Sequence, residues 1–480
     1  MKHIRSRELI TNAIWSFSGR FGYLAVGLAA NILLARILGP EEFGKIAIAV
    51  FFVSIGTVLV ESGMSGALVR KQGATAIDFS TVFIFNIGVS LALAILLVAF
   101  SGLISGLYGI DELQSVLQVL SITIIFNALR IIQDVKLIKE MRFKTKAACE
   151  LFSISVGSIL GVSVAFAGAG VWALVVCQLA SSIVLTLVLW CVVGPVGKLV
   201  FKKKSFREFY GFGVNTTAAS ILSSIFDGMY QLILAKYFSV NNAGQYYQAK
   251  KLQDMPVGML QGAALGVVFS ALSKVQDDLQ VFERMYKEVV RLFSVAIAIL
   301  CLAIFLYSDV LVSLLYGGEW GDASHYLKYL SVAAFFYLQE TLNRIVFKVF
   351  NRTDIILKLE IMKKAAQAIT MALGVVTMSV DVLLLGLVVT NIIGFWLGCW
   401  RSSMLRSGAA WMGLRIVLRV SLIAVIVASV RNYVPVELFS RGVLEVVSIL
   451  FLFLLLLVLF GVVSIKKDFV YARNVLRSMK

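Results

Sequence analysis

Polar side chains at helical spacing inside apolar stretches are the groups of this sequence best placed to do chemistry. The stretch 210–235 carries hydroxyl, amide and carboxylate groups at intervals of three and four residues, which puts them on one face of a helix. These residues are Thr216, Ser220, Ser223, Asp227 and Gln231. Such a face either bonds to neighbouring helices or lines a polar cavity, and both interpretations stay open for the hydroxyls.

A cation occupies the corresponding face of the first apolar stretch, residues 10–35. This cation is Arg20, and polar or small residues follow it at helical spacing. A charge near the middle of a bilayer costs at least about 2.5–3.5 kcal/mol on insertion scales. Arg20 and Asp227 are therefore expected to face a cavity or to form an ion pair with each other.

Further charges lie in two later apolar stretches. In residues 245–272 the spacing of four between Lys250 and Asp254 predicts an ion pair and leaves Lys251 pointing elsewhere. In residues 324–347 Glu340 and Arg344 are also four apart. The charges of this second stretch lie toward its end, so snorkelling to the interface is the alternative to a functional role for them.

One more carboxylate, Glu61, lies in "LVESGMSG" near the end of the second apolar stretch. It is interpreted either as an ion-coupling group or as an ordinary interfacial one.

Cations outnumber carboxylates among these intramembrane positions, which suits an anionic substrate such as a phosphate. We expect four cations to bind the substrate, namely Arg20, Lys250, Lys251 and Arg344. Six further residues are predicted to couple an ion or to line the cavity, namely Asp227, Glu61, Asp254, Glu340, Thr216 and Ser220.

Metal, cofactor and disulfide chemistry is not expected. The two histidines, His3 and His325, fall outside the apolar stretches. The five cysteines are scattered singly in apolar sequence, without disulfide or metal-ligand spacing. The sequence has no long hydrophilic insertion that could form a soluble catalytic domain. We therefore expect that the protein is not an enzyme.

The elements that must position these residues are membrane spans. The chain is 60% hydrophobic and 15% charged over 480 residues, and runs long enough to cross about 30 Å of hydrocarbon recur along it. We predict about fourteen spans between residues 10 and 465. Most Lys and Arg residues fall on the side of the N-terminus, which by the positive-inside rule places both termini in the cytoplasm. The net charge of +17 is thus a topology signal, with attraction to membrane lipids second, and it does not indicate nucleic acid.

Internal similarity indicates a repeat of six spans. Residues 31–44, "NILLARILGPEEFG", match residues 231–244, "QLILAKYFSVNNAG", and "LYGIDEL" from residue 107 matches "LYGGEWG" from residue 315. Later, Leu129-Arg130 is matched with Asn343-Arg344. Such repeats are typical of secondary transporters, in which access to a site between the repeats alternates.

The predicted fold is an all-α integral membrane protein with two parallel six-helix bundles and a C-terminal helix pair. We place the bundles at 1–205 and 206–405, and the two additional spans with a cytoplasmic tail at 406–480. Arg36 and Lys236 lie at equivalent outer corners of the two bundles. They are interpreted as headgroup anchors or as a ring around the outer mouth.

Several motifs resemble a known family. They are "NAIWSFSGRFGYLAVGLAANILLARILGPEEFGKIAIAV", "ESGMSGALVRKQ", "KEMRFKTKAACE", "FSALSKVQDD" and "LYGGEWGDA". Together they resemble Wzx-type polysaccharide transporters of the MOP superfamily, and the resemblance covers nearly the whole chain. It implies a flippase in the bacterial inner membrane that moves undecaprenyl-pyrophosphate-linked oligosaccharide to the outer leaflet for surface polysaccharide synthesis. It also implies central cations for the pyrophosphate, a role that Arg20, Lys250, Lys251 and Arg344 fit.

Alternatives stay open beside this interpretation. A lipid II flippase shares the fold and a basic cavity, whereas a multidrug antiporter of the superfamily would favour an acidic and aromatic cavity. A membrane-embedded glycan polymerase or ligase would need a longer outer loop. Coupling to H⁺ or Na⁺ and a partner polysaccharide polymerase are further expectations.

Overall fold

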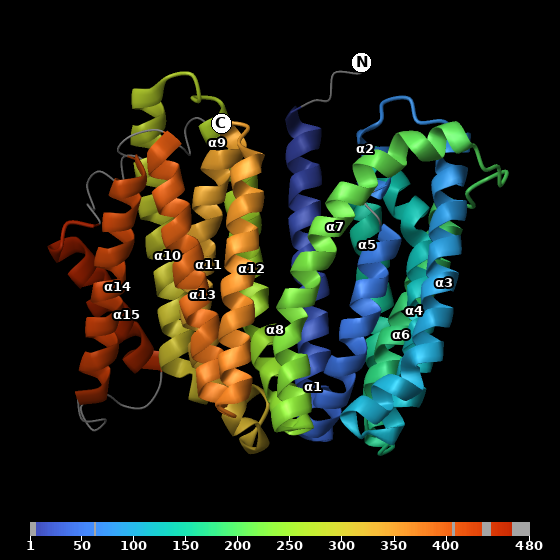
Figure 1. Ribbon diagram of the computed structural model, residues 1–480, viewed down its shortest axis with the longest axis horizontal. Coiled ribbons are helices and arrows are strands. Elements are labelled where there is room, and N and C mark those ends of the chain that lie inside the picture. Colours follow the sequence, from blue (N-terminus) through green and yellow to red (C-terminus); the bar gives the residue numbers. More distant parts are fainter. Residues whose placement is uncertain (1–5, 62–63, 406–408, 434–442, 463–480) are drawn as a thin grey trace. The chain divides into compact units, whose positions relative to one another are not determined.

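Every regular element of the described chain is a helix. The computed structural model describes residues 6–61, 64–405, 409–433 and 443–462, and no strand occurs among them (Figure 1). The predicted all-α class is confirmed.

The helices divide into two compact units by their contacts. Unit 1 comprises residues 1–247 and 315–320, and unit 2 comprises 248–314 and 321–480. These units follow contacts rather than the repeat, whose limits at 205 and 405 stay a prediction.

Unit 1 is built from the first seven helices and the start of the eighth. In Figure 1, α3, α4, α5 and α6 run side by side, and α7 slants across them. The bounds are α1 Ser6–Glu61, α2 Met64–Arg70, α3 Ala76–Tyr108, α4 Asp111–Lys139, α5 Phe143–Phe166, α6 Trp172–Val193, α7 Lys203–Ile233, the π-helix η1 Leu234–Phe238 and α8 Val240–Ala263.

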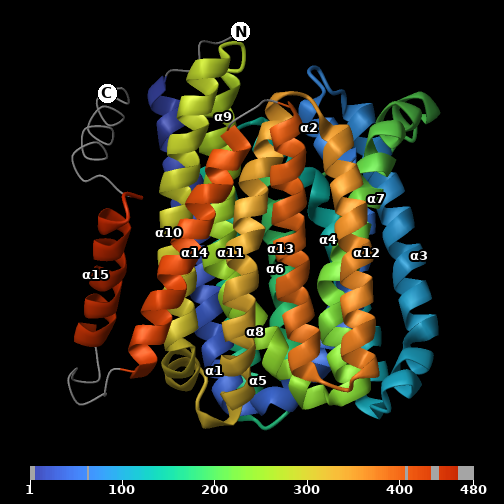
Figure 2. The ribbon, with the colours of Figure 1, turned by 60° about the vertical axis from the view of Figure 1, so that its left-hand side comes forward.

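Unit 2 contains the later helices, which are seen best in Figure 2. Its apolar core joins α10, α11, α13, α14 and α15, with Leu302, Leu338 and Ile423 among its buried members. The bounds are η2 Ala264–Val268, α9 Phe269–Ser273, α10 Leu279–Leu315, α11 Gly321–Val349, α12 Thr353–Val376, α13 Val380–Leu405, α14 Ala409–Tyr433 and α15 Val443–Leu459. The short helix η3, Gly318–Trp320, belongs to unit 1.

Eight helices of the described chain are long and apolar enough to cross a membrane. Four others, α7, α8, α11 and α12, have 24 to 31 residues but carry polar and charged side chains. At 1.5 Å per residue even 24 residues reach about 36 Å, which is enough to span. Because α1 reverses within its length, it supplies two passes.

The reversal in α1 occurs at Gly39 and Pro40. Gly39 has φ 72°, a value that an L side chain rarely adopts. Pro40 has no backbone N–H and its ring disfavours a continuous helix. The first corner of the repeat is therefore fixed by two adjacent residues.

The two repeated corners pack against each other reciprocally. A Cβ atom on Gly44 would lie 2.0 Å from the carbonyl oxygen of Val240, and one on Gly244 would lie 1.8 Å from that of Pro40. Pro40 and Val240 are 200 residues apart, as are Gly44 and Gly244, so the two contacts are equivalent in the two corners. Only glycine permits this backbone contact, which explains why both copies carry it.

The corner cations cap helix ends. Arg36 Nε donates to the carbonyl of Leu315 at 2.9 Å, and Lys236 Nζ donates to the carbonyl of Leu107. Leu315 and Leu107 lie in the last turns of α10 and α3, where carbonyls lack helical partners and cations are favoured. The two corner cations therefore bind the carbonyls of Leu315 and Leu107 within unit 1, a role that neither interpretation from the sequence included.

Trp320 completes this contact within unit 1. It is buried, its Nε1 donates to the carbonyl of Ala35 at 3.2 Å, and its ring meets Phe43 edge-on at 5.5 Å. Gln245 Nε2 donates to the carbonyl of Glu319 at 2.8 Å. We call residues 315–320 and the two corners the clasp.

The helix lengths correct one of the matches between the two predicted repeats, that of Arg130 with Arg344. Helices α4 and α11 both have 29 residues, and the turns after them share a left-handed residue, Met141 in one and Asn351 in the other. With a constant offset of 210 residues, Arg130 corresponds to Glu340 and not to Arg344. The expected match assumed an insertion that two helices of equal length exclude.

Candidate functional site

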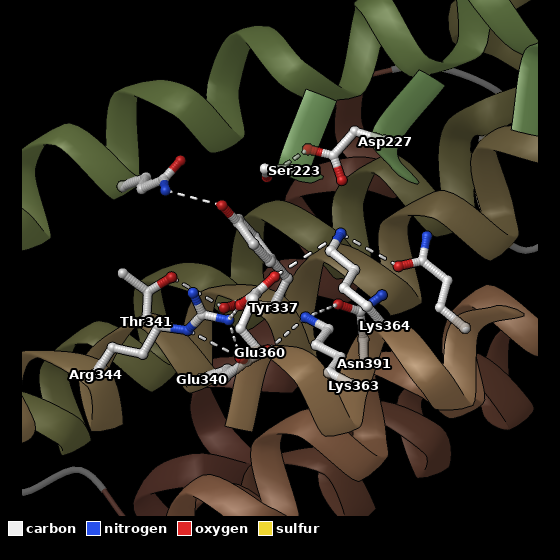
Figure 3. A network of polar contacts seen from close by, with 12 residues as sticks. Ser223, Asp227, Tyr337, Glu340, Thr341, Arg344, Glu360, Lys363, Lys364 and Asn391 are labelled. Atoms are coloured by element: carbon white, nitrogen blue, oxygen red, sulfur yellow. Dashed lines mark hydrogen bonds and ion pairs between the residues drawn. The ribbon is translucent and has the colours of Figure 1, made fainter. Parts of the chain in front are cut away.

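A buried ion pair on three helices of unit 2 forms the centre of the candidate site. Lys363 Nζ on α12 donates to Glu340 Oε2 on α11 at 2.6 Å and to Asn391 Oδ1 on α13 at 3.1 Å (Figure 3). The side chains of Lys363 and Glu340 are 8% and 5% exposed. A buried charge needs such a partner, since an isolated one costs far more than a hydrogen bond returns.

Small residues and an aromatic ring shape the space around this pair. A Cβ on Gly394 of α13 would lie 2.8 Å from Glu340 Oε2 and 3.0 Å from Lys363 Cδ, so the glycine leaves room for the pair. Lys363 Nζ also lies 5.4 Å from the centroid of the Tyr337 ring. The Tyr337 hydroxyl accepts a hydrogen bond from Gln261 Nε2 at 2.9 Å.

Arg344 extends the pair into a chain of charges. Its Nη2 donates to Glu340 Oε1 at 2.5 Å, and the same group donates to Glu360 on α12. Lys364 Nζ lies 3.8 Å from Glu360 Oε1 and donates to Gln367 Oε1 at 3.3 Å. The order of charges is thus Lys363, Glu340, Arg344, Glu360, Lys364. We call these five residues the charge chain.

The charge chain is rich in cations and has an accessible edge. It contains three cations, Arg344, Lys363 and Lys364, and two carboxylates, Glu340 and Glu360. Arg344 and Glu360 are 27% and 22% exposed, against 8% for Lys363 and Lys364. A guanidinium in this position can exchange a carboxylate for another anion with little movement, because both present paired oxygens to its fork of donors.

The position of the charge chain is inside the helices and not at their ends. Lys363 is the eleventh residue of α12, which begins at Thr353, or about 15 Å from that end. Glu340 lies nine residues before the end of α11. Such depth in a membrane helix marks a functional position more often than a surface one.

Unit 1 carries a comparable but neutral network on α4 and α5. Arg130 Nη1 pairs with Asp134 at 2.8 Å, and Lys146 Nζ pairs with Asp134 at 2.5 Å and with Glu150 at 3.1 Å. Arg130 also donates to Asn127 Oδ1 at 3.0 and 3.1 Å. At corresponding places of α4 and α11 the order of the pair is inverted, since Arg130 and Asp134 answer Glu340 and Arg344.

The site residues predicted from the sequence lie in different environments in the structure. The expected Lys250–Asp254 ion pair is present, and Lys251 is exposed. Glu340 and Arg344 belong to the charge chain. Glu61 ends α1 and is exposed, in the electrostatic range of Arg130 and Lys146.

On the polar face of α7, Asp227 accepts a hydrogen bond from Ser223 Oγ at 3.3 Å, and Ser220 is exposed. Arg20 is exposed and makes no ion pair with another residue of the described chain. The alternative of an Arg20–Asp227 ion pair is therefore not realised. The side chain of Thr216 lies outside the described residues.

Four partners in the site were not predicted from the sequence, namely Glu360, Lys363, Lys364 and Asn391. The apolar run in this part of the sequence predicts a span at 359–379, which puts the charges of α12 at its edge, whereas the helix begins at Thr353. The i, i+4 spacing of Glu360 and Lys364 was a usable signal. The turn at Asn351, in register with that at Met141, fixes where α12 starts.

Comparisons with known proteins place this geometry in context. A family model described as polysaccharide biosynthesis protein matches residues 33–325. The succinoglycan biosynthesis transport protein ExoT of Rhizobium meliloti is 23% identical over 320 residues, which are 67% of this chain and 65% of that protein. The lipopolysaccharide biosynthesis protein WzxC of Escherichia coli is 21% identical over 338 residues, which are 68% and 66%. The matches thus span slightly less than two thirds of these relatives.

The fold also has a solved counterpart. The structure of a lipid II flippase, MurJ, in an inward closed conformation has a TM-score of 0.74, is 17% identical and covers 96% of this chain and 100% of its own. At this identity the likeness concerns the fold alone.

Proposed function

The chain belongs to the polysaccharide biosynthesis protein family, and from this premise we propose that it carries a lipid-linked oligosaccharide across a membrane. The cargo is an undecaprenyl-pyrophosphate-linked repeat unit that moves outward by alternating access for surface polysaccharide synthesis. The location is the bacterial inner membrane, with both termini cytoplasmic, and the protein is a transporter and not an enzyme. Relatives named for polysaccharide transport and lipopolysaccharide biosynthesis support this class.

The gathering of three cations in one network inside the helices is the observation that carries the proposal. A lipid pyrophosphate has about two negative charges, and a cationic site lowers the cost of taking it out of water. Arg344 holds the phosphates at the exposed edge, where they replace Glu360 as its partner, and Lys364 adds positive charge from a buried position next to Glu360. Lys363 and Glu340 keep the three helices in place.

The other predicted residues have supporting roles in this proposal. Arg20, Lys250 and Lys251 add positive charge along the path of the headgroup. Asp254 orients Lys250 through their ion pair. Ser220, Thr216 and Asp227 give α7 a polar face, and Glu61 or Asp227 exchanges H⁺ or Na⁺ if transport is ion-coupled.

A lipid II flippase is the second candidate, because a protein of that description shares the fold. Both cargoes carry a pyrophosphate, so the charge chain does not separate them. The two cargoes differ in their glycan, so transport of each must be compared directly. A multidrug antiporter fits less well, since its cationic cargo would be repelled by a positive site.

The test is a flipping assay in proteoliposomes with fluorescent undecaprenyl-pyrophosphate oligosaccharide. Full-length protein is expected to expose the label to an external quencher, and Arg344→Gln to slow this about tenfold or more, equivalent to about 1.4 kcal/mol. Arg352→Gln is the matched control, since Arg352 is exposed and forms its ion pair with a near neighbour in the chain, Asp354. Arg344→Lys keeps the charge and reports on folding.

Two results would count against the proposal. Movement of lipid II without movement of the oligosaccharide would favour the second candidate. Flipping at the unchanged rate by well-folded Arg344→Gln would remove the charge chain from substrate recognition.

A further inference from the structure

The segment that joins α6 to α7 is unusually basic and has no acidic partner within the described chain. Residues 194–207, "GPVGKLVFKKKSFR", contain five exposed cations, which are Lys198, Lys202, Lys203, Lys204 and Arg207. None of them forms an ion pair with another residue that the structure describes. We call residues 194–207 the basic segment.

The carboxylates nearby are already used by another cation. Lys71, between α2 and α3, pairs with Glu208 at 2.9 Å and with Asp78 at 3.2 Å. The hydrogen bond that Lys71 donates to Glu208 raises the pKa of this lysine above its ordinary value, so it stays charged and keeps its partners. The first turn of α7 contains no acidic residue. The positive charge of the basic segment is therefore uncompensated within the described part of unit 1.

Backbone hydrogen bonds fix this segment to the start of α3. The N–H of Val200 donates to Ser80 Oγ at 2.6 Å, and the N–H of Lys202 donates to Thr81 Oγ1 at 3.1 Å. Both hydroxyl residues are buried. The chain here has a defined course, although it is not helical before Lys203.

This course turns three consecutive apolar side chains outward. Leu199, Val200 and Phe201 are 63%, 45% and 49% exposed. The Phe201 ring lies beside that of Phe206, with centroids 5.8 Å apart. Exposed apolar residues in sequence with lysines are typical of segments that lie in a membrane interface.

We propose that the basic segment binds the phosphate headgroups of anionic phospholipids, with Leu199, Val200 and Phe201 inserted among the acyl chains beneath them. Two observations favour a lipid surface over a soluble anion or a nucleic acid. The segment follows α6 and contacts the start of α3, both apolar membrane-spanning helices, so it lies at the membrane edge. Its apolar side chains would have no use at a purely ionic site.

The binding has a consequence for α7. Three lysines lie at the start of this helix, at Lys202, Lys203 and Lys204, where cations are disfavoured by the helix dipole. Lipid phosphates would neutralise them and steady the helix that carries Ser220 and Asp227. This inference does not depend on the identity of the transported cargo.

The experiment is a thermal-stability titration of the full-length protein in a neutral detergent. Dioctanoyl phosphatidylglycerol is the probe, with dioctanoyl phosphatidylcholine and glycerol phosphate as parallel arms. Phosphatidylglycerol is expected to raise the Tm by several degrees more than phosphatidylcholine does, while glycerol phosphate leaves it unchanged. Lys202→Gln, Lys203→Gln and Lys204→Gln in one variant should abolish at least half of that difference.

A matched variant controls for the loss of three charges. Lys274→Gln, Lys287→Gln and Lys348→Gln remove exposed lysines of unit 2, and this variant should respond as the unchanged protein does. A second variant, Leu199→Ser with Val200→Ser, keeps all cations and should also weaken the response. Equal responses of the basic-segment variant and the unchanged protein would overturn the proposal, as would a full response to glycerol phosphate.

Discussion

At the scale of single residues, Lys363 is the clearest case of a charge that the fold requires. Its ammonium shares Glu340 with Arg344 and is also bonded to Asn391. Lys363→Met removes one cation and leaves the Asn391 and Glu340 oxygens short of a donor in a buried place. We expect a loss of about 3–5 kcal/mol in the free energy of unfolding, the usual cost of breaking a buried pair.

The measurement is thermal or denaturant unfolding of the purified protein. Lys358→Met on the same helix is the control, because Lys358 is exposed and such changes usually alter stability by less than about 0.5 kcal/mol. Equal stability of the two variants would mean that Lys363 is dispensable for folding and that its burial serves another purpose.

What the sequence predicted at this scale was local. The spacing of four gave the Lys250–Asp254 pair correctly, because i, i+4 neighbours meet on any helix. Glu340 and Arg344, for which only the spacing was noted, form an ion pair for the same reason. Glu360 and Asn391 come from other helices, and their contacts depend on which faces pack together. Residue spacing along the sequence does not reveal which helix faces meet in the folded protein.

At the scale of elements, the clasp explains why both corners keep glycine. Gly44→Ala and Gly244→Ala would each place a methyl group within 2.0 Å of a carbonyl oxygen of the other corner. Because that obstacle is backbone, it cannot swing aside as a side chain could. We expect each variant to lose about 1–3 kcal/mol of stability, as overpacking does.

Gly88→Ala is the control with the opposite expected sign. Gly88 lies in α3, and a Cβ added to it would have no atom within 4 Å. Alanine is the better helix former by about 1 kcal/mol, so this variant should be neutral or more stable. Thermal unfolding of the three variants compares them directly, and a Gly244→Ala protein as stable as Gly88→Ala would refute a tight clasp.

The apolar runs of the sequence predict the ends of some helices and not of others. Long runs such as those of α3 and α6 locate membrane helices because the bilayer demands them. The predicted stretch 324–347 also agrees with α11 within three residues at each end. In α12 the charges Glu360, Lys363 and Lys364 interrupt the apolar run, so the predicted start at residue 359 lies six residues after the observed start at Thr353. The sequence shows that both corners carry a glycine. Only the tertiary structure shows that Gly44 and Gly244 pack each against the other corner.

At the scale of the whole molecule, the predicted repeat pairs two similar helices whose charges differ. Helices α4 and α11 have equal length, yet the Arg130–Asp134 pair of one is the inverted Glu340–Arg344 pair of the other. The network around the first contains two cations and two carboxylates, and that around the second contains three cations and two carboxylates. The predicted duplication accounts for the equal lengths of these two helices, and the proposed anion site lies where their charges differ.

The membrane potential should act on the proposed transport through the charge of the cargo. Arg344, Lys363 and Lys364 belong to helices and do not leave with the lipid, so the charge transferred in each cycle is that of the pyrophosphate itself. Moving about two negative charges outward across a membrane that is negative inside releases about 2.3 kcal/mol per charge per 100 mV. In proteoliposomes, a potassium diffusion potential of this sign should therefore raise the equilibrium ratio of outer to inner labelled lipid more than tenfold. A ratio that ignores the potential but follows a proton or sodium gradient would show that a cation travels with the substrate, and would move attention to Glu61 and Asp227.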